Sequence, residues 1–349
     1  MRPGTWLMPP LLALAVILLA GGLQVSGQTS PETPPAPGQS RAQSPSRIPS
    51  GPGGIAFWRD DGIYYLSPGS EKPVRLRSGR SPALSPDGKR VVFCAEAKQP
   101  DAKGQAGVEA SGPGLILLDL ATGKETTILK AEGQEVIRAP VWSPDSDRLA
   151  FVARTGLKGQ LGLIQSDGSG RRALFSQGDE NTLGLILGLV WAAEGKSLWF
   201  HDLHDLYRVS DAGVLLSKTP LIGIMGKTSP EAGIIVSGEE RFVPNPAGPQ
   251  LIAFTKTVKA SRAYEKAFAD DLPGISALFL YDSRTKTRTR LTPKDMFASH
   301  PCWSRDGQYL YFSGYRRPHY KEEEPFRIYR VRRNGQGLLE ITRGRDPSL

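Results

Sequence analysis

Five consecutive residues near the middle of the chain, His201-Asp202-Leu203-His204-Asp205, bring together two imidazoles and two carboxylates. Such a set could hold a divalent metal ion, because imidazole and carboxylate are both common metal ligands. The alternative is an ordinary polar turn, because Trp199-Phe200 and Leu206-Tyr207 flank the segment as strand residues and polar clusters of this kind are typical of turns. We favour the turn and predict that His201 and His204 are not metal ligands.

Other signs of catalysis are missing from the sequence. There is no Gly-x-Ser-x-Gly elbow, no His-Glu-x-x-His and no phosphate-binding Gly-x-x-x-x-Gly-Lys. The two cysteines, Cys94 and Cys302, have no neighbours at metal-ligand spacing and define no disulfide framework, so we interpret them as small buried hydrophobes. The sequence therefore predicts no catalytic residue, no cofactor and no metal, and favours a protein that is not an enzyme.

The elements that position these side chains are predicted by an internal repeat. Each copy has a Pro, an apolar or aromatic residue two positions later, a turn, and then a run with strand alternation. The copies are SPALSPDGKRVVF (81–93), APVWSPDSDRLAFVA (139–153), HPCWSRDGQYLYFSG (300–314) and the degraded GLVWAAEGKSLWF (188–200) and RFVPNPAGPQLIAFTK (241–256). Asp87, Asp145 and Asp306 are interpreted as turn formers that hydrogen-bond to their own backbone.

A second strand pair follows each copy, so that each unit has four short antiparallel strands, which is one blade of a β-propeller. The first strands, in 55–79, match strands two to four of a blade and lack the inner Pro-x-Trp strand. The chain finishes with GRDPSL (344–349), which matches the GRSPAL of 79–84. We therefore predict an all-β, six-bladed propeller over 54–349, in which Arg345–Leu349 form the inner strand of the first blade.

The Pro-x-Trp-Ser-Pro-Asp motif from Pro140 to Asp145, with its relative from Pro301 to Gly307, resembles the WD-like repeat of TolB-type propellers. The resemblance covers nearly all of 54–349 and implies the fold more strongly than a function. TolB-like proteins are periplasmic adaptors, which implies a binding role here. Two departures are expected. The TolB family carries an α/β domain before the propeller, whereas only a leader and tether precede the repeats here. The related propellers of prolyl-oligopeptidase-type enzymes are accompanied by a hydrolase domain, which this sequence lacks.

The first 53 residues are expected to lie outside the folded domain. Arg2, the apolar run Leu11–Ala20 and the small Val25 and Gly27 indicate a signal peptide over 1–27, with an uncleaved membrane anchor as the alternative. Residues 28–53 are rich in Pro, Ser and Gly and predict a disordered linker. We expect an exported protein, periplasmic or extracellular, that is a monomer and has no stable membrane span after cleavage.

Three enlarged loops, 95–114, 255–276 and 313–326, are predicted to emerge at one mouth of the propeller and to bind a protein or a cell-envelope component. The predicted binding residues, chosen because Tyr and Arg are common at binding hot spots, are Tyr264, Tyr315, Arg316, Arg317, His319 and Tyr320. The net charge of +9 comes from scattered residues, so nucleic acid is not an expected partner. The rival hypothesis is a propeller enzyme, either a metal-dependent hydrolase or lyase or the propeller module of a prolyl-oligopeptidase-like system.

Overall fold

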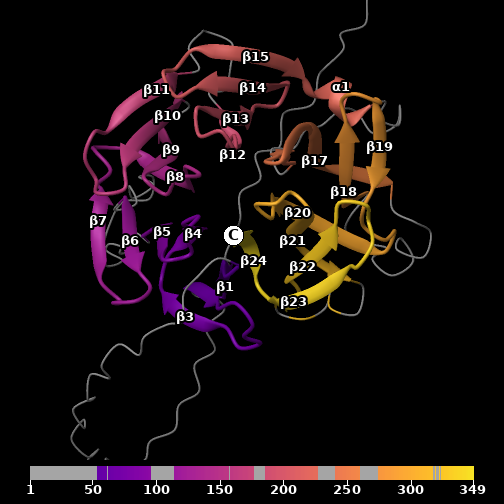
Figure 1. Ribbon diagram of the computed structural model, residues 1–349, viewed down its shortest axis with the longest axis horizontal. Helices are drawn as coiled ribbons and strands as arrows, with labels where there is room; N and C mark the ends of the chain where they lie inside the picture. Colours follow the sequence, from indigo (N-terminus) through magenta and orange to yellow (C-terminus); the bar gives the residue numbers. More distant parts are fainter. Residues whose placement is uncertain are drawn as a thin grey trace, which may run out of the picture. The chain divides into compact units, whose positions relative to one another are not determined.

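The computed structural model describes residues 53–60, 62–95, 114–156, 158–176, 185–226, 240–259, 274–316, 319, 322 and 324–349. These residues belong to one compact unit. They form six four-stranded antiparallel sheets set around a central axis (Figure 1). The six-bladed all-β propeller predicted from the repeats is therefore confirmed. The predicted leader and all of the predicted linker except Gly53 lie outside the described residues.

The strands fall into four concentric sets, counted outward from the axis. The innermost strands, in blades 1 to 6, are β24 (Arg345–Ser348), β4 (Arg80–Leu84), β8 (Val136–Trp142), β12 (Leu187–Trp191), β16 (Phe242–Asn245) and β20 (Met296–Trp303). The second strands are β1 (Ile55–Arg59), β5 (Arg90–Cys94), β9 (Arg148–Thr155), β13 (Ser197–His201), β17 (Gly248–Lys259) and β21 (Tyr309–Arg316). The third strands are β2 (Gly62–Leu66), β6 (Leu115–Asp119), β10 (Lys158–Gln165), β14 (Asp205–Ser210), β18 (Gly274–Asp282) and β22 (Arg327–Arg332). The outermost strands are β3 (Val74–Arg77), β7 (Glu125–Leu129), β11 (Arg172–Ser176), β15 (Leu215–Pro220), β19 (Thr287–Arg290) and β23 (Leu339–Arg343).

The hydrophobic core lies between neighbouring blades, because each blade is covered on both faces of its sheet by the blades beside it. In β5, Val91 and Val92 point to opposite faces of the sheet, and both are fully buried. The two side chains belong to different clusters, Val91 packing with blade 1 residues such as Ile63 and Val92 with blade 3 residues such as Leu149. A blade therefore depends on both of its neighbours for its stability.

The Trp of the repeat joins one blade to the previous one. Its indole N–H donates a hydrogen bond to a backbone carbonyl oxygen on the inner strand of the preceding blade. The bonds are Trp142 to Ala83 (3.0 Å), Trp191 to Val141 (3.3 Å) and Trp303 to Val243 (2.9 Å). A buried indole needs such an acceptor, and this explains why Trp recurs at this position of the repeat.

The turns after the inner strands have the geometry that the Ser-Pro-Asp-Gly sequence predicts. In blade 6, Asp306 Oδ1 accepts hydrogen bonds from Ser304 Oγ (2.6 Å) and from the Gln308 backbone N–H (3.0 Å). These bonds lower the pKa of Asp306. Asp87 and Asp145 make the same two contacts in their own turns. The prediction that all three are turn formers is confirmed.

The ring is closed by the C-terminal strand, as predicted. Strand β24 pairs antiparallel with β1, with Ala56 opposite Ser348 and Trp58 opposite Arg345, and the C-terminus lies near the axis (Figure 1). Ser348 Oγ accepts a hydrogen bond from the Leu84 backbone N–H of blade 2 (3.0 Å). Closure therefore joins blade 1 to its neighbour as well as completing its own sheet, and it covers the inner edge of β1.

The inner strands share a distortion that faces the axis. The residue before the Pro, or before its equivalent, has a positive φ in five blades: Ser81 (51°), Ala139 (50°), Gly188 (60°), His300 (47°) and Asp346 (55°). The pairing with the second strand shifts register at the same place, which is the signature of a β-bulge. Because a positive φ is unfavourable for residues with a Cβ, the packing around the axis must impose it.

Candidate functional site

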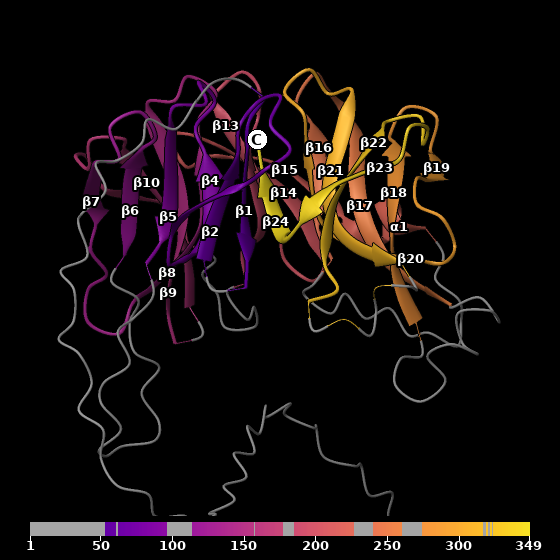
Figure 2. The same ribbon diagram turned by 90° about the horizontal axis from the view of Figure 1, so that it is seen from below.

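The two open ends of the ring differ, because strand direction is the same in every blade. All second strands end at one mouth, and the antiparallel innermost strands begin there. Strands β5, β17 and β21, which precede the three enlarged loops, end at this mouth with Cys94, Lys259 and Arg316. We call it the insertion mouth, and the opposite end, with the Ser-Pro-Asp-Gly turns, the turn mouth. Figure 2 shows the blades from the side, with the strands running between the two mouths.

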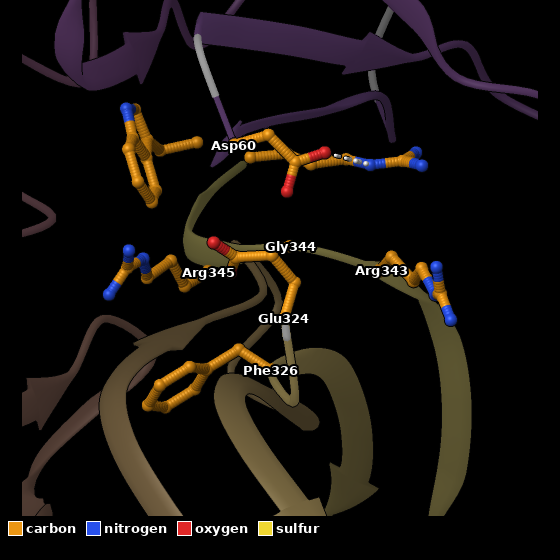
Figure 3. A pocket seen from close by; sticks show the side chains of 8 residues that line it. Asp60, Glu324, Phe326, Arg343, Gly344 and Arg345 are labelled. Carbon is orange, nitrogen blue, oxygen red and sulfur yellow. Dashed lines mark ion pairs between the residues drawn. The ribbon is translucent and has the colours of Figure 1, made fainter. Parts of the chain in front are cut away.

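A small cleft opens between blades 1 and 6 at the insertion mouth (Figure 3). Its lining comes from the end of β1, the start of β24 and the segments next to β22 and β23. The lining residues are Trp58, Arg59, Asp60, Glu324, Phe326, Arg343, Gly344 and Arg345. Three of them are arginines and two are aromatic, which is a composition typical of protein-binding surfaces.

Arg345 is held in this cleft by two aromatic rings. Its guanidinium carbon lies 4.0 Å from the centre of the Trp58 ring and 5.4 Å from that of Phe326. Gly344 sets up this placement, because its φ is 136° and a Cβ there would lie 2.4 Å from Phe57. No residue within the described ranges accepts a hydrogen bond from the Arg345 guanidinium or forms an ion pair with it. The group is therefore a cation fixed by stacking, with its N–H donors available.

Three other charged residues of the cleft, Arg59, Asp60 and Arg343, form ion pairs. Arg59 Nε lies 3.4 Å from Asp60 Oδ2, the ion pair dashed in Figure 3. Arg343 Nη2 lies 3.1 Å from Glu322 Oε2, and the buried Arg327 also pairs with Glu322. A hydrogen bond from His319 and the contact with Arg327 lower the pKa of Glu322 to about 2. This carboxylate therefore stays ionised throughout the physiological pH range and holds the two arginines in place.

The predicted binding residues fall into three groups. Arg316 is exposed at the end of β21, and His319 Nδ1 lies 2.7 Å from Glu322 Oε1. Tyr264, Arg317 and Tyr320 lie outside the described residues. Tyr315 is buried, with 6% of its surface exposed. Binding by these six residues stays a prediction.

The burial of Tyr315 changes what its replacement should do. The ring stacks on Phe297, with centroids 4.9 Å apart, and meets the edge of Phe326 at 5.4 Å. Phe326 in turn stacks on Arg345. The burial of this ring predicts that replacing Tyr315 lowers the stability of the protein. Tyr315 thus contacts the Phe326 side of the cleft lining, and its role in binding stays a prediction.

The segment from His201 to Asp205 is a compact polar turn. Asp202 Oδ1 accepts hydrogen bonds from the backbone N–H groups of His204 and Asp205 (both 2.7 Å), and its Oδ2 accepts one from the Tyr207 hydroxyl (2.9 Å). The exposed His204 and the buried His201 do not converge on an ion site. Across the described ranges, no group of three or more His, Cys, Asp or Glu residues could hold a metal ion.

His201 is a buried histidine in its neutral form. Its Nδ1 lies 2.8 Å from the Asp202 carbonyl oxygen, so Nδ1 carries the proton and Nε2 is the basic nitrogen. Burial lowers the pKa of His201 to about 4, and the nearby Arg241 charge acts in the same direction. The ring packs edge-on against Phe242, with centroids 5.0 Å apart. His201 therefore contributes to the packing between blades 4 and 5.

One pair of titratable side chains meets on adjacent innermost strands. His300 Nδ1 of blade 6 lies 3.4 Å from Asp346 Oδ1 of blade 1, and both side chains are about 40% exposed. Ser81 occupies the equivalent position in blade 2. Asp346 thus lies on the strand between those of the histidine and the serine, whereas a Ser-His-Asp triad needs the histidine between the other two. The arrangement is not that of a serine hydrolase.

Both cysteines are free. Burial raises the pKa of the Cys94 thiol to about 12 and raises that of Cys302 as well. Cys302 Sγ donates a hydrogen bond to the Pro347 carbonyl oxygen (3.1 Å). These thiols are structural, and their environments do not generate the thiolate that nucleophilic chemistry requires.

Comparisons with known proteins show the fold and nothing finer. No protein-family model matches the chain, and no curated protein sequence matches it. Among solved structures, TolB from Acinetobacter baumannii is 17% identical with a TM-score of 0.58, over 85% of this chain and 66% of that one. A chain of a nidogen/laminin complex is 12% identical with a TM-score of 0.52, over 84% of this chain and 97% of that one. An oligogalacturonate lyase in complex with manganese is 15% identical over 74% of this chain and 70% of that one, but its TM-score of 0.44 carries no argument.

The chain thus spans slightly less than two thirds of the length of that TolB. The class established by these findings is the six-bladed β-propeller with distant structural similarity to TolB. Within the described part of the chain, no helix is long and apolar enough to cross a membrane. The one described helix, α1 (Leu221–Met225), has only five residues.

The cleft residues were not among those chosen from the sequence. Trp58 and Phe326 carry no local signal, because they meet only when the ring closes. Arg345 does carry one. Arg80, Arg138 and Arg345 all stand two residues before the Pro of an inner strand, in GRSPAL, IRAPVW and GRDPSL. This Arg-x-Pro pattern could have identified the mouth as a place where cations recur.

Proposed function

We propose that this protein is an exported, non-enzymatic binding scaffold that holds a protein or another cell-envelope component at the insertion mouth. One observation carries the proposal. The strands that lead into the three enlarged loops end at the mouth where the arginine and aromatic cleft opens. Inserted loops on a rigid scaffold are where binding residues concentrate, and exposed Arg and aromatic groups dominate the energy of many interfaces.

Export rests on the composition of the first residues. Arg2 followed by the apolar run Leu11–Ala20 is typical of a signal peptide. Expression in a bacterial host and N-terminal sequencing of the exported protein test this part. A mature chain that begins at Gln28 supports cleavage, whereas an intact Met1 on a membrane-bound protein supports the anchor.

The binding role is tested by affinity capture from envelope extract with the full chain. Arg316 and Arg343 are partly or fully exposed at the insertion mouth, and Arg284 is an exposed arginine in a turn at the turn mouth. We expect an Arg316→Glu, Arg343→Glu variant to lose a partner that the wild type retains, and Arg284→Glu to retain it. Because exposed substitutions change stability by about 0.5 kcal/mol or less, all three proteins should have similar melting temperatures. A partner lost only with Arg284→Glu would contradict the proposal.

A propeller enzyme is the second candidate, and the contact between His300 and Asp346 favours it. A carboxylate beside an imidazole can orient it as a general base. Its test is a screen of the purified protein for hydrolase and lyase activity, with and without added divalent metal. An activity lost in His300→Asn and in Asp346→Asn, at unchanged melting temperature, would support this candidate over the scaffold.

A further inference from the structure

We infer that the insertion mouth recognises an acidic peptide segment through an arc of three arginines, Arg345, Arg80 and Arg138. The inference rests on the proposed binding function and names the chemistry of the partner. The three residues occupy equivalent positions, two residues before the Pro of the innermost strand, in blades 1, 2 and 3. These strands are neighbours, since β4 contacts both β24 and β8.

Arg345 is the best-defined member of the arc. Stacking between Trp58 and Phe326 fixes the plane of its guanidinium, so little side-chain entropy is lost when it binds a ligand. Its edge can donate two parallel hydrogen bonds, the geometry that matches a carboxylate. The carboxylates of the cleft do not compete for it, because Asp60 pairs with Arg59 and no ion pair joins Glu324 to Arg345 among the described residues.

Arg80 and Arg138 extend the same surface across the next two blades. Both are exposed. The same position in the other three blades holds Leu187, Glu240 and Ser299. The cations are thus confined to one half of the ring, which suits a ligand that lies along an arc and does not fill the channel.

The surroundings favour an acidic peptide over a phosphate polymer. The cleft is narrow and carries the carboxylates of Asp60 and Glu324 beside its arginines. A polymer with a charge on every unit would bring some of its charges against these carboxylates, which costs binding energy. Glutamate side chains of a peptide place their carboxylates several bonds from the backbone. Their aliphatic stems can rest on the rings of Trp58 and Phe326.

Fluorescence anisotropy with a labelled peptide of four Glu-Ala repeats tests the inference on the full-length protein. The matched control peptide has four Gln-Ala repeats, and tripolyphosphate serves as a competitor. We expect the acidic peptide to bind and the Gln peptide not to bind, with affinity falling as salt is raised. Arg345→Gln, Arg80→Gln and Arg138→Gln should each raise the Kd about tenfold, because one charge-assisted contact contributes roughly that factor. Arg284→Gln at the turn mouth should leave the Kd unchanged.

Arg80 and Arg138 keep the test informative if Arg345→Gln unfolds, because both are exposed and neither lies on the closing strand β24. Equal binding of the two peptides, or three arginine variants with the wild-type Kd, would overturn the inference. So would tight binding of tripolyphosphate without binding of the acidic peptide, which would point to a phosphate ligand. Whichever of these outcomes is found, the capture experiment with the Arg316→Glu, Arg343→Glu variant still decides whether the insertion mouth binds a partner.

Discussion

Removal of the closing strand β24 should abolish most of the free energy of unfolding of this propeller. Deleting Arg345–Leu349 removes the pairing with β1 and the cation–π contact with Trp58. It also removes three hydrogen bonds that involve side chains, from Leu84 N–H to Ser348 Oγ (3.0 Å), from Asp346 N–H to Ser313 Oγ (2.8 Å) and from Cys302 Sγ to the Pro347 carbonyl oxygen (3.1 Å). Leu349 no longer packs on the cluster that joins blades 1 and 6.

The magnitude follows from these contacts. A hydrogen bond contributes about 1 kcal/mol and a cation–π contact about 0.5–2 kcal/mol. A Leu side chain contributes about 2 kcal/mol when it is partly buried, the lower end of the range for Leu→Ala. The deletion should therefore cost on the order of 5 kcal/mol or more. A typical domain has only about 5–15 kcal/mol of stability, and the exposed edge of β1 adds a tendency to aggregate.

Urea unfolding followed by tryptophan fluorescence measures this loss. Leu349→Ala should cost about 2 kcal/mol. The matched control is Leu339→Ala on the outermost strand of blade 6, where the side chain is 48% exposed and the cost should stay near about 0.5 kcal/mol. A deletion variant within about 1 kcal/mol of the wild type would refute the reasoning that ring closure holds the fold together.

Three further predictions concern single side chains. The pKa of His201 is about 4 in the folded protein, below its ordinary value of 6.5. The stability that its neutral form contributes is therefore complete above pH 6.5, and roughly 3 kcal/mol is lost as the pH falls toward 4. Urea unfolding between these pH values should show this slope and His201→Gln should flatten it, whereas an unchanged slope would contradict the assignment. Tyr315→Ala should lower stability by about 3 kcal/mol because its ring is buried, while Arg316→Ala should change it by about 0.5 kcal/mol or less; equal melting temperatures for the two variants would show that Tyr315 is not part of the core. Cys94 and Cys302 should react with a thiol reagent only after unfolding, because burial raises the pKa of both; rapid labelling of the native protein would disprove it.

The fold could be predicted from the sequence because each blade repeats the same local signals. Trp142 of one inner strand bonds to the preceding blade, and Asp145 holds the turn that follows that strand. The closing strand could be predicted for the same reason, since GRDPSL copies the start of another blade. Helix α1 was not predicted, because Leu221–Met225 is short and has no acidic residue in its first turn and no side-chain cap.

The site was harder to predict, because its contacts join residues that are far apart in the sequence, from the first and the last blade. Arg345 meets Trp58 from the first blade and Phe326 from the sixth, and neither neighbour belongs to the repeat. Tyr315 was chosen as a binding residue because its loop is rich in Tyr and Arg, yet it is buried near the end of strand β21. Residue type alone does not distinguish a ring that faces a partner from one that supports the surface behind it.

Site-specific photo-crosslinking in living cells tests most directly the central claim that the insertion mouth is the binding surface. A photoreactive amino acid replaces Ser78, which is exposed beside the start of β4 at this mouth, or Arg284, which is exposed at the turn mouth. Binding at the insertion mouth predicts a crosslinked partner with the probe at position 78, none at position 284, and loss of the crosslink when Arg343→Glu is added. A crosslink confined to position 284 would contradict it.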